Sequence, residues 1–183
     1  MNELETILGE ITNVLQQIPP AEVGELAVQL LKSKRIFVVG EGRSGLMGKS
    51  FAMRLMHLGA TVYVIGETIT PAMGTEDTLV AISGSGTTES VNFIAEKARK
   101  LNCQVIAVTT DSMARLTELA TRTFLIPAAT KYRKQGETQS IQPLSSLFDQ
   151  SLHLFLDAVC LRFAEESKQS HSSVLARHSN LES

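Results

Sequence analysis

The sequence predicts an α/β fold, a three-layer αβα sandwich in which a five-stranded parallel sheet lies between helices. Five short runs rich in β-branched residues each end at a turn residue or a proline, which is typical of strands. Helical patterns separate these runs, and near-continuous apolar strands separated by helices favour a parallel sheet covered on both faces. The length of 183 residues, 43% of them hydrophobic, fits a single domain over residues 1–183 with a substantial core.

Two helices are expected before the first strand. Apolar side chains in residues 3–18 recur at steps of three and four, which places them in one stripe on a helix. Pro19 and Pro20 end this helix, and the same spacing predicts a second one over residues 21–33. Residues 1–33 therefore form an N-terminal helical pair.

The sheet and its helices are expected over residues 34–128. The predicted strands are the runs RIFVVG, ATVYVIG, DTLVAISG, CQVIAVT and RTFLIP. The predicted helices between them lie at about 44–58, 88–101 and 113–120.

The C-terminal part of the sequence predicts a long helix over residues 142–166 and a polar, mobile tail over residues 170–183. Apolar residues cover more than one face of the long helix, which indicates burial against the sheet and against another subunit. Its polar residues recur at three and four and form one stripe: Gln142, Ser145, Asp149, His153 and Asp157.

Composition and charge favour small-molecule chemistry in the cytoplasm. A net charge of −2 gives no broad attraction for nucleic acid or anionic lipid. Acidic residues stand near the N-terminus where a signal peptide needs basic ones, and no apolar run approaches the ~20 residues of a membrane span. Cys103 and Cys160 are expected to be buried, reduced thiols, and no cluster of residues has metal-ligand spacing, so we expect no cofactor.

Two glycine-containing motifs imitate nucleotide-binding loops. Residues 40–45, GEGRSG, satisfy G-x-G-x-x-G with Glu67 about twenty residues on, but the sheet is short for the two halves of a dinucleotide site. Residues 48–50, GKS, resemble the end of a Walker A loop, but Arg43 replaces the required glycine and the stretch reads as helix interior. Both nucleotide interpretations are therefore disfavoured.

The stretch SGSGTT, residues 83–88, follows an apolar strand and predicts a phosphate site. Glycines allow the backbone to approach a ligand, and a helix beginning near Thr88 directs its free N–H groups toward it. Ser83, Ser85 and Thr88 add neutral donors, so a phosphate could be held without a basic side chain. Helix capping alone is the alternative interpretation.

The same stretch resembles the S-x-S-G-x-T signature of sugar isomerase (SIS) domains. Longer blocks, from GRSGLMGKSFAMRLMHLGATVYVIGETITP through IQPLSSLFDQSLHLFLDAV to RHSNLE, resemble the 6-phospho-3-hexuloisomerase family of the ribulose monophosphate pathway, which serves formaldehyde fixation and detoxification. The resemblance covers nearly the whole chain. It implies the SIS fold and a small phosphosugar as substrate.

The resemblance also implies the residues that bind the substrate. The phosphate would be held by Ser83, Gly84, Ser85, Gly86 and Thr88. Ser44 would assist from the facing loop, and Arg43 would contact a sugar oxygen. Glu67 precedes TITP on the face where loops gather, where it would contact the sugar or an adjacent subunit, with a surface position as the alternative.

Two residues are implied to act in catalysis. Asp149 stands where the family has a glutamate that serves as the base, and a simple i, i+4 pair with His153 is its alternative role. His178 matches a C-terminal histidine that enters a neighbouring subunit's site. Such sharing requires at least a dimer, and the family favours homotetramers with sites at subunit interfaces.

The reaction implied converts D-arabino-hex-3-ulose 6-phosphate to D-fructose 6-phosphate through a cis-enediol. A carboxylate with a raised pKa can move the proton between carbons, and a histidine can move it between oxygens. Isomerases of heptose or arabinose phosphates are the alternatives within the enzyme class, because the phosphate loop does not distinguish them. A non-catalytic sugar-phosphate sensor is the alternative outside it.

Overall fold

The computed structural model describes residues 2–133 and 137–181 and contains a five-stranded, entirely parallel sheet. The strands are β1 (Ile36–Gly40), β2 (Val62–Val64), β3 (Thr78–Ile82), β4 (Gln104–Thr109) and β5 (Arg122–Leu125). Their order is β2-β1-β3-β4-β5, so the direction of winding reverses between β1 and β3. The loops that follow these two adjacent strands diverge at the carboxyl edge of the sheet, which is where α/β folds bind ligands.

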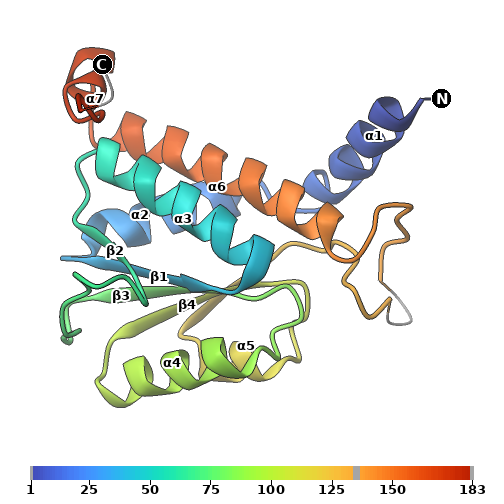
Figure 1. Cartoon of the computed structure of the whole chain (residues 1–183), viewed down its shortest axis with the longest axis horizontal. Coiled ribbons are helices and arrows are strands. Elements are labelled where there is room, and N and C mark those ends of the chain that lie inside the picture. The colour runs from blue at the N-terminus through green and yellow to red at the C-terminus, as the bar shows by residue number, and fades with distance from the viewer. Residues whose placement is uncertain (1, 134–136, 182–183) are drawn as a thin grey trace.

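Helices cover both faces of this sheet. They are α1 (Glu3–Leu15), α2 (Ala21–Lys32), α3 (Gly42–His57), α4 (Glu89–Lys100), α5 (Arg115–Leu119), α6 (Ser146–Glu166) and α7 (His171–Leu175). Figure 1 shows α2, α3 and α6 on one face and α4 and α5 on the other, with α1 beside the N-terminal half of α6. The predicted αβα sandwich, N-terminal helical pair and long C-terminal helix are confirmed.

The core consists of two apolar layers because successive side chains of a strand point to opposite faces. In β1, Ile36 and Val38 join the layer beneath α2, α3 and α6, while Phe37 and Val39 join the layer beneath α4 and α5. Cys103 and Cys160 are both buried free thiols, as predicted. Across the described ranges, no helix combines the length and apolar character needed to cross a membrane.

The C-terminal region differs from prediction in two places. The long helix begins at Ser146 rather than at residue 142, because Pro143 disfavours helical backbone before it and Leu144 adopts a left-handed φ of 54°. The predicted tail forms a short helix, α7, whose N-cap Ser170 accepts a hydrogen bond from the Ser173 backbone N–H at 3.1 Å. Residues 182–183 of that tail lie outside the described residues.

Candidate active site

A cavity of about 440 Å³ opens at the carboxyl edge of the sheet. Its walls come from the loops after β1 and β3 and from the segment that leads into α6. The residues that line it are 41–44, 82–85, Thr88, Lys131, 143–146 and Asp149. Figure 1 shows the N-terminal ends of α3, α4 and α6 gathered at this edge. Three helix termini with positive partial charge therefore converge on one cavity.

The hydroxyl side chains of the loop after β3 are arranged around the start of α4. Thr88 is the N-cap residue of α4, but its hydroxyl makes no capping hydrogen bond. It lies 2.8 Å from the Ser83 hydroxyl, which also accepts a hydrogen bond from the Gly86 N–H at 3.1 Å. Helix capping alone therefore does not explain why a hydroxyl side chain stands at position 88. The first N–H groups of α4 have no partner within the helix, as an anion site requires.

Close packing requires glycine at position 86 and leaves little room for a side chain at position 84. Gly86 has a φ of 64°, and a Cβ added there would lie 2.3 Å from the Ala114 Cβ. A Cβ added at Gly84 would lie 3.1 Å from Cδ1 of Phe148, on the first turn of α6. The Gly84 carbonyl accepts hydrogen bonds from the backbone N–H and the hydroxyl of Thr110, at 3.1 and 2.9 Å. These contacts fix the loop between β4 and α6.

Asp149 is the buried carboxylate of the cavity, with 3% of its surface exposed. The Ser44 hydroxyl donates to its Oδ1 at 2.8 Å, and Arg43 Nε lies 3.5 Å from its Oδ2. Burial raises the pKa of Asp149 above its ordinary value, while the Ser44 hydrogen bond and the charge of Arg43 act in the opposite direction. A carboxylate with a raised pKa is a stronger base than an exposed one.

The alternative role of Asp149, a helix pair with His153, is not what the structure contains. His153 Nε2 instead lies 3.5 Å from Oδ2 of Asp157, one turn further along α6, and both side chains are partly exposed. Asp149 instead faces the first turn of α3, where it contacts Ser44 and Arg43. Arg43, in the first turn of α3, also donates from Nη1 to the Ser146 hydroxyl at 2.8 Å, which joins the start of α3 to the start of α6.

Most of the predicted site residues meet in this one cavity. Its lining includes Arg43, Ser44, Ser83, Gly84, Ser85, Thr88 and Asp149. Gly86 lies behind the lining, where it shapes the loop through its contact with Ala114.

Glu67 and His178 are not among the residues that line this cavity. The Glu67 carboxylate lies 2.7 Å from Lys49 Nζ, with both side chains about half exposed. The His178 ring stacks on that of His57 at 5.1 Å between centroids and 22° between planes. His57 ends α3, so it lies about 20 Å from Ser44 at 1.5 Å per residue. His178 is thus at the end of α3 that is remote from the cavity of its own chain. Figure 1 shows α7, which precedes His178, beside the C-terminal end of α6.

The two motifs that imitate nucleotide-binding loops have structural explanations. A Cβ added at Gly45 would lie 2.5 Å from the Gly40 carbonyl oxygen, so glycine there allows α3 to start against the end of β1. Residues 48–50 lie within α3, and Lys49 forms the ion pair with Glu67. Neither motif forms a separate nucleotide site.

Lys131, a cationic residue that lines the same cavity, was not predicted from the sequence motifs. It belongs to the segment after β5 and lies far from the loop of residues 83–88 in the sequence. A signal was present in the basic stretch TKYR, residues 130–133, which follows a predicted parallel strand and so lies near its carboxyl end.

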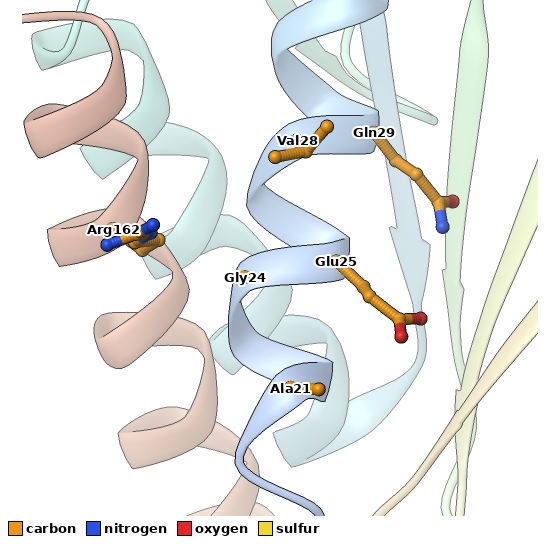
Figure 2. Close-up of a pocket in the computed structure, with 6 residues that line it drawn as sticks. All are labelled: Ala21, Gly24, Glu25, Val28, Gln29 and Arg162. Carbon is orange, nitrogen blue, oxygen red and sulfur yellow. The ribbon is translucent and has the colours of Figure 1, made fainter.

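A second hollow, of about 420 Å³, lies beside α2 and α6 and offers no comparable set of groups. Figure 2 shows Glu25 and Gln29 directed to one side of α2, away from Arg162 on α6. These polar groups already have partners, since Glu25 accepts from Arg122, Gln29 from Gln104, and Arg162 pairs with Glu166. In the described ranges no group of three or more His, Cys, Asp or Glu side chains could hold a metal ion.

Comparisons with known proteins agree with this geometry. Residues 29–154 match the SIS domain family. The chain is 40% identical over 176 residues to a 3-hexulose-6-phosphate isomerase of Bacillus subtilis, which covers 96% of this chain and 95% of that protein. It is 39% identical to a protein of the same name from Mycobacterium gastri, over 99% of this chain and 90% of the relative.

A solved structure from Methanococcus jannaschii, described as inferring a molecular function of 3-hexulose-6-phosphate isomerase, is similar over 99% of both chains. Its TM-score is 0.85 and its sequence identity is 34%. The similarity therefore includes the helices outside the matched family region, α1 and α7 among them.

Proposed function

The chain belongs to the SIS domain family, and we propose that it is a 3-hexulose-6-phosphate isomerase. The observation that carries this proposal is the buried carboxylate of Asp149 in the same cavity as the hydroxyl loop at the start of α4. The substrate would be D-arabino-hex-3-ulose 6-phosphate and the product D-fructose 6-phosphate. Relatives of that name, similar over nearly their whole length, support the assignment.

The loop of residues 83–88 binds the phosphate in this proposal. The N–H groups at the start of α4 and the hydroxyls of Ser83, Ser85 and Thr88 supply donors for its oxygens. The sugar carbons then extend across the cavity toward α6. Binding the phosphate at one end fixes which carbon faces the base, which is how remote binding energy aids the reacting centre.

Asp149 moves the proton between carbons. Its carboxylate removes the proton from C2, the ketone at C3 becomes part of a cis-enediol, and the same carboxylic acid returns the proton to C3. Arg43, which lies beside Asp149, would stabilise the negative charge that develops on a sugar oxygen. A further proton must pass from O2 to O3 before the new ketone forms at C2, and His178 of a neighbouring subunit would carry it.

This role of His178 requires an assembly, for which we propose a homotetramer with sites at subunit interfaces. The distance between His178 and the cavity of its own chain supports such sharing. Large apolar side chains also remain exposed on α1 and α6, with Leu4 at 72%, Leu8 at 63% and Leu161 at 64%. The cytoplasmic ribulose monophosphate pathway is the proposed setting.

The test is an assay with purified protein and three substrates in parallel. We expect conversion of hexulose 6-phosphate to fructose 6-phosphate, followed by a coupled dehydrogenase, and no turnover of sedoheptulose or arabinose phosphates. Treatment with a chelator should leave the rate unchanged. Preferential turnover of another phosphosugar would contradict the substrate assignment, and tight binding without any turnover would favour a sensor.

A further inference from the structure

One cation in the candidate active site has no ion-pair partner in the described part of the chain. The charged residues that line the cavity are Glu41, Arg43, Lys131 and Asp149. Arg43 pairs with Asp149 at 3.5 Å, and Glu41 accepts a hydrogen bond from the Ser90 hydroxyl at 2.8 Å. The ammonium of Lys131 instead lies 5.1 Å from the centroid of the Tyr132 ring. Among the described cavity-lining residues, Lys131 is therefore the cation that no carboxylate already neutralises.

The charges of the cavity show why a ligand would need it. The carboxylates of Glu41 and Asp149 offset the two cations, so the lining is close to neutral as a whole. A phosphate dianion would add two negative charges beside those carboxylates, and like charges at short range repel. Neutral donors at residues 83–88 can orient the phosphate, but they do not supply a full positive charge.

The backbone around Lys131 is fixed at the wall of the cavity. The Lys131 N–H donates to the Ser145 hydroxyl at 3.1 Å, just before α6. Its neighbour Thr130 is 1% exposed and donates from its backbone and its hydroxyl to the Glu137 carboxylate, at 2.8 and 2.6 Å. The Lys131 residue itself is exposed. The backbone of Lys131 is thus held at the wall of the cavity, while its side chain is exposed and lines the same cavity as residues 83–85.

We propose that Lys131 is a substrate-binding residue whose ammonium pairs with the phosphate dianion held by residues 83–88. The inference rests on the proposed phosphosugar site and adds the charge that the loop itself lacks. On binding, the ammonium exchanges a weak contact with an exposed aromatic ring for a charge-assisted hydrogen bond. In this proposal, the loop of residues 83–88 after β3 and Lys131 after β5 bind the same phosphate.

The experiment is Lys131→Met, assayed for turnover and for inhibition by inorganic phosphate. We expect KM and the inhibition constant of phosphate to rise about tenfold, with kcat within about twofold of the native value. Added salt should raise KM less in this variant than in the native protein, because the screened charge is absent. Lys131→Arg should recover most of the affinity, since it retains the charge.

A matched control is Lys97→Met on α4. Lys97 also rests on an aromatic ring, at 4.8 Å from the Phe93 centroid, but it does not line the cavity, so KM and phosphate inhibition should not change. Unchanged constants in Lys131→Met, or a fall in kcat alone, would overturn the proposal.

Direct calorimetric binding of fructose 6-phosphate separates this inference from the proposed function. If the protein binds the phosphosugar without isomerising hexulose phosphate, weaker binding by Lys131→Met would still support the role of Lys131. Equal binding by native protein and variant would refute that role even in an active isomerase.

Discussion

Two aspartates, Asp77 and Asp149, have almost the same burial and opposite pKa shifts. Asp77, just before β3, is 2% exposed, and Asp149 on α6 is 3% exposed. The guanidinium of Arg35 donates to both oxygens of Asp77 at 2.9 and 2.5 Å, and the Gly74 N–H donates at 2.6 Å. This environment lowers the pKa of Asp77, chiefly through Arg35, whereas burial raises that of Asp149.

The difference teaches that the donors around a buried carboxylate decide whether the cost of its burial is offset, as at Asp77, or remains, as at Asp149. Asp77 lies at the amino edge of the sheet, where its paired donors satisfy the charge. Asp149 borders the cavity at the carboxyl edge with one hydroxyl donor and a more distant arginine. Its oxygens therefore retain lone pairs that can accept a proton from a substrate, which is what a general base requires.

The largest expected effect comes from removing the reactive carboxylate. Asp149→Asn should reduce kcat about 10³-fold, because an amide cannot accept the C2 proton, while fructose 6-phosphate still binds. The measurements are steady-state kinetics and calorimetric binding. Asp157→Asn, on the same helix but exposed and paired with His153, is the control and should retain activity. Substantial turnover by Asp149→Asn would refute the assignment of the base.

The second effect concerns the structural carboxylate. Asp77→Asn should lower the free energy of unfolding by about 2 kcal/mol, because Arg35 and Gly74 lose a charged acceptor. Its kcat should remain near the native value. Urea unfolding gives the stability, and Glu76→Gln, which removes an exposed partner of Lys34, should change it little. Loss of activity in folded Asp77→Asn would remove the distinction between the two sites.

A third effect follows from the opposite pKa shifts. The folded pKa of Asp77 lies below its unfolded one, so its stabilisation is present above the unfolded pKa and is lost as pH falls through the folded pKa. The folded pKa of Asp149 lies above its unfolded one, so ionised Asp149 opposes folding, and stability from this group increases as pH falls through the folded pKa.

Urea unfolding across acidic pH measures both behaviours. As pH falls, the free energies of unfolding of the native protein and of each variant should converge. For Asp149→Asn this convergence should occur at a higher pH than for Asp77→Asn. The rate kcat/KM should fall over the range in which Asp149 becomes protonated. If both stability differences diminish over the same pH range, the two environments do not differ as the structure indicates.

The fold and the phosphate loop could be predicted because their signals are local in the sequence. Apolar runs, turn residues and the spacing in SGSGTT all lie within short windows, and each element keeps its identity in the structure. The start of α6 could not be placed by periodicity alone, because the apolar and polar spacing continues through residues 142–145 although Leu144 adopts a left-handed conformation.

The wall opposite the phosphate loop is harder to predict because it combines distant segments. Lys131, after β5, lines the cavity with its N–H bonded to Ser145, near the start of α6. The residues near Asp77 and Asp149 in the sequence do not indicate which of the two aspartates forms close hydrogen bonds with an arginine. The family resemblance identified Asp149, whereas its difference from Asp77 depends on contacts such as Ser44 across 105 positions.

The smallest expected effect tests the Ser44 hydroxyl, which donates a hydrogen bond to the reactive carboxylate. Ser44→Ala removes a hydrogen bond that lowers the pKa of Asp149, so the acid limb of the kcat/KM profile should move to higher pH. The rate at neutral pH should fall less than about tenfold, because Asp149 remains in place. Ser90→Ala, which removes a donor to Glu41 instead, should leave the acid limb where it is. A shift to lower pH in Ser44→Ala would contradict the prediction. It would show that this hydroxyl does not stabilise the ionised carboxylate of Asp149.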